Sequence, residues 1–192
     1  MEIFKTPILL ASKSPRRSQL LKEAGFDIRI DSVEVEEIYD ENLQKESVAA
    51  YLAELKAEAS KILLKDGEVL IASDTIVLQE NIIYGKPKDR EEAIKTLETL
   101  SDNSHKVITG VCMVYGDQKI VFSDQSTVYL DPLSKEEIEY YVDFFNPYDK
   151  AGAYAIQEWI GHCKISKIEG TYNNIMGLPV QLVYRNLVKL LS

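Results

Sequence analysis

Hydrophobic and polar positions follow two different periods along this chain, one typical of strands and one typical of helices. Uninterrupted apolar runs at Ile8–Ala11 and Val69–Ala72 have the length of buried strands. Other stretches carry apolar residues three and four positions apart, which indicates helices with one buried face. We expect these helices at 15–24, 47–64, 89–100, 134–145 and from 179 toward the C-terminus.

The remaining stretches are rich in β-forming or turn residues. Two of them, 106–115 and 119–130, flank a Gly-Asp pair and predict a long hairpin, with a β-bulge at Gly110. Because helices alternate with strands early in the chain and antiparallel pairs come later, we expect an α/β fold with a mixed central β-sheet flanked by helices. Shorter expected elements are a hairpin turn at Glu80-Asn81, extended segments at 26–35 and 163–168, and a polar loop at 170–177.

The first strand leads through a loop into a helix, and the residues there suit an anion. Ser12 and Ser14 precede Pro15, and Ser14 is in position to cap the helix. A helix start directs free backbone N–H groups at one place, and Lys13, Arg16 and Arg17 add three cations, so phosphate is the expected anion. The alternative is an ordinary strand–turn–helix unit with solvated arginines, since the loop has neither the Walker nor the GxGxxG pattern.

Asp74 follows the second buried run and lies between two hydroxyl residues. A carboxylate that interrupts an apolar run is costly unless it is satisfied or used, and ligand sites of α/β sheets gather at strand ends. We therefore expect Asp74 to be functional. Lys56, at the border of its helix's apolar stripe, either extends to solvent or reaches into a cleft. That stripe is predicted to comprise Val48, Tyr51, Leu52, Leu55, Ala59 and Ile62.

Two more charged residues belong to the same candidate site. Lys86 lies on a tight turn, and Glu37 ends an acidic run that is otherwise typical of solvated surface. Cations for a polyphosphate together with carboxylates for a divalent metal are the groups that phosphoanhydride cleavage needs.

The net charge of the chain argues against one class of binding partner. The chain has 192 residues and a formal net charge of −9, so a polyanion such as DNA would be repelled, and we expect no nucleic acid polymer as partner. The first residues lack an apolar run long enough for a signal peptide or a membrane span, so we expect a cytoplasmic protein that does not bind a membrane.

The chain length predicts the number of domains, and the few cysteines and histidines are not expected to take part in catalysis or metal binding. One domain over 1–192 is expected, either undivided or with two lobes around an active-site cleft. Cys112 and Cys163 are expected to be reduced, inert core residues. His105 and His162 share no spacing with each other or with the cysteines, so we expect neither to ligate a metal.

Eight motifs in order span nearly the whole chain. They are ILLASKSPRR at 8–17, VEE at 35–37, LAELKA at 52–57, ASDTIV at 72–77, GKP at 85–87, SHKVITGV at 104–111, DKAGAYAIQ at 149–157 and NIMGLPV at 174–180. Together they resemble the Maf family of nucleoside triphosphate pyrophosphatases, with VEE standing where many members have VDE. The resemblance implies the Maf/Ham fold, which is similar to that of the inosine triphosphatases.

The resemblance also implies a reaction and roles for individual residues. The family hydrolyses a nucleoside triphosphate to the monophosphate and pyrophosphate with a divalent cation, for which oxygen ligands favour Mg²⁺ or Mn²⁺. Asp74 matches the catalytic proton acceptor at the metal, and Glu37 matches the acidic residue beside it. Arg17, Lys56 and Lys86 match the phosphate-binding cations. By the same resemblance, a homodimer is an option.

Three positions distinguish branches of the family by the base they accept. Here they are Arg16, Thr75 and Gln157, which resembles the branch acting on dTTP and UTP rather than the one for methylated guanine nucleotides. Arg, Thr and Gln offer donors for the carbonyl oxygens of uracil or thymine, and Gln can also accept from N3–H. Modified pyrimidines are an alternative substrate class. Tyr154 either stacks on the base or belongs to the core.

Two other classes of function compete with this enzyme. One is a nucleotide-binding regulator of cell division or septum formation that acts without significant turnover. A carboxylate placed to activate water beside cations favours the enzyme, because a pure binder does not need it. The other class is a phosphotransferase, which no kinase-type motif supports.

Overall fold

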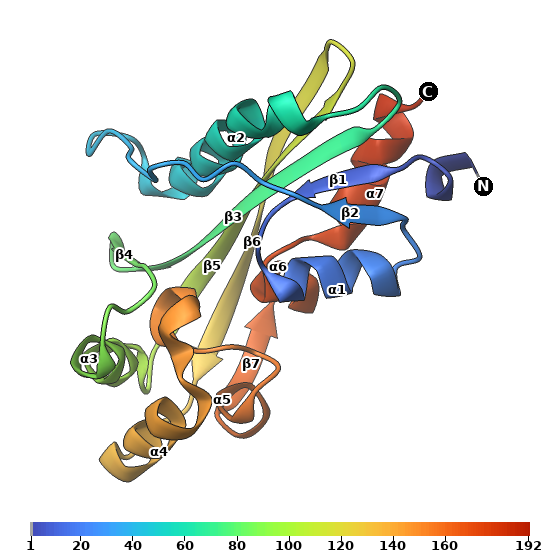
Figure 1. Ribbon diagram of the computed structural model, residues 1–192. Helices are drawn as coiled ribbons and strands as arrows, with labels where there is room; N and C mark the ends of the chain where they lie inside the picture. Colours follow the sequence, from blue (N-terminus) through green and yellow to red (C-terminus); the bar gives the residue numbers. More distant parts are fainter. Residues whose placement is uncertain (1) are drawn as a thin grey trace. The chain divides into compact units, whose positions relative to one another are not determined.

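The computed structural model describes residues 2–192, and its strands form a mixed seven-stranded sheet (Figure 1). The strands follow the order β2-β1-β3-β5-β6-β7, and β4 pairs with β3. β1 is parallel to β2 and β3, whereas the β3–β4 and β6–β7 pairs are antiparallel. The expected α/β fold with a mixed sheet is therefore confirmed. The strands are β1 (Ile8–Ala11), β2 (Ile28–Ile30), β3 (Val69–Gln79), β4 (Ile82–Tyr84), β5 (Ser104–Tyr115), β6 (Gln118–Leu130) and β7 (Ile165–Glu169).

The helices form at most of the expected stretches. The α-helices are α1 (Pro15–Glu23), α2 (Val48–Ser60), α3 (Arg90–Leu100), α4 (Lys135–Phe145), α5 (Trp159–Cys163), α6 (Tyr172–Met176) and α7 (Val180–Leu190). Single 3₁₀ turns lie at Glu2–Phe4, Lys45–Ser47, Lys61–Leu63, Pro147–Asp149 and Ala151–Ala153. Within residues 2–192, none of these helices has the length and apolar character needed to cross a bilayer.

The chain divides into two compact units. The first comprises the chain up to Asp74 together with Thr109–Asp124 and Gly177–Ser192. The second comprises Thr75–Ile108 and Gln125–Met176. Because the long strands β3, β5 and β6 each contribute residues to both units, neither unit is a continuous stretch of sequence.

In the first unit, α2 lies against the sheet through its small residues. The buried face consists of Val48, Ala49, Leu52, Ala53, Ala57 and Ser60, whereas Tyr51 and Ile62 are exposed, so the predicted stripe was wrong in part. A Cβ atom on Gly110 of β5 would lie 2.3 Å from the backbone of Ala49 and Ala50. The alanines thus let the helix backbone touch the strand, and this close approach requires a glycine at position 110. The β-bulge at Gly110 stays a prediction.

β3 differs from the expectation in one respect that matters for the site. The predicted strand ends at Ala72, but β3 continues through Asp74 to Gln79. Its neighbour β1 stops at Ala11, which pairs with Ala72. Asp74 therefore lies not at the end of its own strand but just beyond the carboxyl end of the parallel strand beside it. The β3–β4 hairpin turn at Glu80-Asn81 is confirmed, and both of its turn residues have positive φ.

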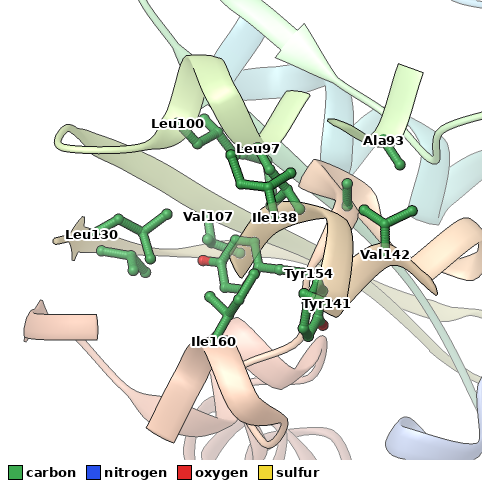
Figure 2. Close-up of a cluster of buried hydrophobic side chains, with 13 residues drawn as sticks. Ala93, Leu97, Leu100, Val107, Leu130, Ile138, Tyr141, Val142, Tyr154 and Ile160 are labelled. Carbon is green, nitrogen blue, oxygen red and sulfur yellow. The ribbon is translucent and has the colours of Figure 1, made fainter. Parts of the chain in front are cut away.

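The second unit has its own apolar core, which Figure 2 shows in close-up. α3 and α4 contribute Leu97 and Ile138 to it. Both helices start as the sequence predicts: Asp89 accepts from the Glu92 N–H at 2.9 Å, and Ser134 forms a full capping box with Glu137. The core is completed by Val77, Ala93, Leu100, Val107, Val128, Leu130, Tyr141, Val142, Ala153, Tyr154 and Ile160.

Several short elements differ from the expectation. The stretch 170–177, predicted as a loop, contains the helix α6. The strand predicted at 163–168 is β7, which begins later, after α5. Of the extended stretch 26–35, only 28–30 forms a strand. Cys112 is buried as predicted, but Cys163 is exposed at the end of α5 and is not a core residue. These differences lie in segments of five residues or fewer, where the hydrophobic period is too short to identify the element.

Candidate functional site

The turn between β1 and α1 is held by its first serine. Ser12 Oγ accepts from the Ser14 N–H at 3.2 Å and from Arg17 Nη1 at 3.2 Å. Ser14 occupies the N-cap position, as predicted, but its side chain makes no capping hydrogen bond. Its hydroxyl therefore does not cap the helix.

Arg17 connects this turn to two distant parts of the first unit. Its Nη1 donates to the backbone carbonyl of Ser73 at 2.8 Å, and its Nε donates to the carbonyl of Gly177 at 2.9 Å. Burial lowers the pKa of the guanidinium, and the charges of Asp74 and Glu37 oppose that shift. Arg17 remains cationic, since arginine is protonated at any ordinary pH. Its first role is to fix the turn against β3.

Lys56 of α2 joins the two carboxylates of the candidate site. Its Nζ lies 2.7 Å from Glu37 Oε1 and makes a short contact with Asp74 Oδ1. Asp74 is buried, with 8% of its surface exposed, and Glu37 is half-exposed. Of the two alternatives for Lys56, the structure thus shows the one in which the lysine reaches inward. These three side chains and Arg17 gather at the carboxyl end of β1.

The carboxylates of this cluster suit a hard divalent cation. No group of three or more His, Cys, Asp or Glu side chains is placed to hold a metal within residues 2–192. Mg²⁺, however, is usually held by one or two carboxylates together with substrate phosphates rather than by a complete protein cage. Asp74 and Glu37, which share one ammonium group, fit that pattern.

In the second unit, two motifs of the sequence meet at Gly152. Its N–H donates to the carbonyl of Gly85 at 3.1 Å, which joins the GKP turn to the DKAGAYAIQ segment. Gly152 has a φ of +72°, and a Cβ atom there would lie 2.8 Å from the side chain of Val77. The side chain of Lys86 is exposed on this turn.

Gln157 and Tyr154, in the same segment, have different environments. Gln157 Oε1 is buried and has no hydrogen-bond partner among residues 2–192. Tyr154 is packed in the core, and its hydroxyl lies 2.7 Å from His105 Nε2. Tyr154 therefore belongs to the core rather than to a base-stacking surface. Burial lowers the pKa of His105 to about 4, so its imidazole is neutral at pH 7.

The structure thus brings together part of the predicted set. Ser12, Ser14, Arg17, Lys56 and Asp74 are connected by contacts within the first unit, with Glu37 bound to Lys56. Arg16 is the second residue of α1, next to Arg17, and its charge lowers the pKa of Arg17. The other three predicted residues, Thr75, Lys86 and Gln157, belong to the second unit.

Sequence reasoning missed the groups that hold the cluster in place. The carbonyls of Ser73 and Gly177 anchor Arg17, and neither carbonyl was assigned a role. The motif NIMGLPV, which contains Gly177, was the only signal that this distant stretch matters. A backbone carbonyl is present at every residue, so composition cannot point to it.

Comparison with known proteins places the chain in a family. A family model described as "Maf-like protein" matches residues 7–190. The chain belongs to the Maf-like family. The Maf-like relatives include a dTTP/UTP pyrophosphatase of Porphyromonas gingivalis, 47% identical over 188 residues, which are 95% of this chain and 94% of the relative. A dTTP/UTP pyrophosphatase of Christiangramia forsetii is 45% identical over 185 residues, 96% of this chain and 94% of the relative.

A solved structure supports the fold of this Maf-like chain. The structure of a HAM1 protein from Coxiella burnetii covers 96% of this chain and 98% of its own, with a TM-score of 0.52 and 13% identity. At this identity the likeness concerns the fold alone, and it confirms the expected Maf/Ham architecture.

Proposed function

We propose that this protein is a nucleoside triphosphate pyrophosphatase that hydrolyses dTTP and UTP to the monophosphate and pyrophosphate. The observation that carries the proposal is the Asp74–Lys56–Glu37 cluster, which lies in the same unit as the serine-rich start of α1. The name shared by relatives 44–47% identical over nearly the whole chain supports the choice of substrate.

The polyphosphate binds, in this proposal, at the turn between β1 and α1. Ser14 and the first N–H groups of α1 donate to phosphate oxygens, and the positive end of the helix stabilises the negative charge. Lys56 is paired with two carboxylates in the structure, and its ammonium can exchange one of them for a phosphate oxygen, which is also a charged acceptor. Arg17 keeps the turn in place and adds its charge, and Lys86 is proposed as a further phosphate-binding cation.

Asp74 is the proposed general base. Its carboxylate is nearly buried and held by Lys56, so it is directed at one place rather than mobile in solvent. A water beside Asp74 Oδ can transfer its proton to the carboxylate as the water oxygen attacks phosphorus. The anhydride bond between the α- and β-phosphates then breaks, which gives the monophosphate and pyrophosphate. Asp74 and Glu37 would hold Mg²⁺ or Mn²⁺, which when bound offsets phosphate charge and acidifies water.

Pyrimidine recognition is assigned to Gln157, with Arg16 and Thr75 as further specificity residues. The buried Oε1 of Gln157 lacks a donor in the structure, and a buried orphan acceptor carries a cost of about 1–3 kcal/mol. Uracil and thymine carry an N3–H donor that satisfies it, whereas N3 of cytosine is an acceptor and does not. This supports UTP and dTTP over CTP, and a 5-substituent on the base does not alter the N3–H group.

Several wider expectations also belong to the proposal. We infer that residues 1–192 act as one functional domain, that the protein works in the cytoplasm on free nucleotides, and that it forms a homodimer. Size-exclusion chromatography with light scattering tests the last of these.

Pyrophosphate release from a panel of triphosphates tests the proposed activity. The panel contains dTTP, UTP, CTP, dCTP, GTP, 7-methyl-GTP and ITP, each with Mg²⁺, with Mn²⁺ and with excess EDTA. We expect turnover of dTTP and UTP that EDTA abolishes. Preference for another base would keep the chemistry and overturn the assignment of Gln157. Nucleotide binding without turnover would instead favour the regulator of cell division.

A further inference from the structure

Gln157 lies in a tight turn whose two ends meet the same hydroxyl group. The Glu158 N–H donates to the Ala155 carbonyl at 3.1 Å and closes a turn over Ala155–Glu158. Tyr141 Oη accepts from the Ala155 N–H at 3.0 Å, and it donates to Glu158 Oε2. One phenol oxygen thus binds the residue two before Gln157 and the residue immediately after it.

Tyr141 and its partner Glu158 are both held in place. Its ring is fully buried in the core of the second unit, where Figure 2 shows it beside Val142, and it stacks on Phe145 at 4.9 Å between ring centroids. Glu158 is held on its other oxygen by Lys150, whose Nζ lies 3.4 Å from Oε1. Lys150 is buried as well and also pairs with Asp149 at 2.8 Å. The Tyr141 side chain is therefore held in one position by the core and by its hydrogen-bond partners.

The turn is enclosed by its surroundings as well. Gly161 of α5 lies so close that a Cβ atom there would be 1.7 Å from the carbonyl oxygen of Ile156. The Gln157 carbonyl lies 3.1 Å from His162 Nε2. The backbone of the turn is thus held by contacts, while the side-chain oxygen of Gln157 is buried and has no hydrogen-bond partner in the described part of the chain.

We propose that Tyr141 is a positioning residue for pyrimidine discrimination, because its hydroxyl fixes the turn that presents the unpartnered Oε1 of Gln157. The inference rests on the proposed function, since it assumes that Gln157 meets the base. An orphan acceptor discriminates N3–H from N3 only if it cannot move away from the wrong base. Loss of the clamp would let the turn relax, so that a cytosine is tolerated.

Tyr141→Phe removes the clamping oxygen and keeps the ring in the core. We expect the ratio of kcat/KM for UTP to that for CTP to fall about tenfold, while kcat for UTP changes less than about threefold. Amide hydrogen exchange should show the Ala155 N–H losing protection, with core amides of α3 unchanged. The matched control is Ile138→Val, which removes a methylene group from the same helix in the same core and leaves the Tyr141 hydroxyl in place.

Three outcomes decide the matter. An unchanged UTP/CTP ratio in Tyr141→Phe, with the Ala155 N–H still protected, overturns the role of Tyr141. An equal fall of the UTP/CTP ratio in Ile138→Val also overturns it, because the effect would then come from lost stability. A wild-type protein that does not turn over UTP overturns the proposed function instead, and the exchange measurement still tests the clamp. If Tyr141→Phe does not fold, Glu158→Ala removes one half of the clamp from outside the core and should lower the ratio in the same way.

Discussion

The polar groups that we propose to be functional are paired in one unit and, at Gln157, unpaired among the described residues of the other. In the first, Asp74 and Glu37 already share a partner, Lys56. In the second, Gln157 Oε1 is buried without a partner. Charged groups in a paired cluster can exchange one partner for another when a phosphate arrives, whereas a neutral orphan accepts only a group with the right donor. The first arrangement suits strong binding and proton transfer, and the second suits selection of a base.

The largest effect is expected from a substitution that breaks the charged cluster. Asp74→Asn keeps the shape of the side chain but removes the proton acceptor, so we expect kcat to fall about 10³-fold. Lys56 stays paired with Glu37, so the melting temperature should change little. Pyrophosphate release and a thermal melt measure the two quantities. Activity within tenfold of wild type would show that Asp74 is not the base.

The next largest effect is expected from a substitution that tests how closely α2 packs on β5 in the first unit. Gly110→Ala places a methyl group 2.3 Å from the α2 backbone, which must shift, and we expect a loss of about 3 kcal/mol in the free energy of unfolding. Gly85→Ala, where nothing lies within 4 Å, is the control and should change it by less than about 0.5 kcal/mol. Urea unfolding measures both, and equal losses would contradict the close approach.

Acid should weaken the two units in different pH ranges. Burial holds the pKa of His105 near 4, below its ordinary value of 6.5, so the unfolded chain binds a proton first and stability falls from pH 6.5 to 4. By linkage the loss is about 3 kcal/mol. In the first unit, the hydrogen bond from Arg29 lowers the pKa of Glu68 from 4.5 to about 2. That contribution is present above pH 4.5 and disappears as pH falls toward 2.

Urea unfolding at pH 7, 5.5 and 4 measures the first of these ranges. His105→Phe, which has no proton to gain, should remove most of the slope between pH 6.5 and 4. A slope that persists unchanged in His105→Phe would assign the acid sensitivity to other groups.

A smaller effect concerns recognition in the second unit. Gln157→Leu removes the orphan oxygen, and we expect the preference for UTP over CTP to fall about 10- to 100-fold, with kcat for UTP less affected. Steady-state kinetics on both nucleotides measure it. An unchanged preference would move the discrimination to Arg16 or Thr75.

The smallest effect is expected at the exposed edge of the first unit. Lys13 pairs with Glu34, but 69% and 83% of these side chains are exposed. Solvent and salt screen such pairs. Lys13→Ala should leave both the melting temperature and turnover unchanged, and a loss of turnover would show that Lys13 belongs to the phosphate site.

Sequence periodicity predicted the elements well and their faces less well. The apolar run at Ile8–Ala11 and the capping box at Ser134 are local patterns, and both are confirmed. The buried face of α2 was predicted from its large residues, but Tyr51 is exposed. The helix instead packs through alanines, because Gly110, more than fifty positions away, offers no side chain.

The candidate site shows the same division between local and distant information. Asp74 was predicted from its unusual place among apolar residues, but β3 continues through it, two residues beyond the position that pairs with the end of β1. The bond from Arg17 to the Gly177 carbonyl spans 160 positions, and Tyr141 looks like an ordinary core position in the pattern of α4. Such partners become visible only when the chain is folded.

The contact between α2 and Gly110 has a consequence for activity as well as for stability. Lys56 lies on α2 next to Ala57, which belongs to the face that rests on the sheet. The height of the helix above the sheet therefore sets how deep the lysine ammonium reaches. Added bulk under Ala49 or Ala53 would raise the helix and draw Lys56 away from Asp74. With Lys56 in the role proposed for it, we therefore expect turnover to depend on the distance between α2 and the sheet.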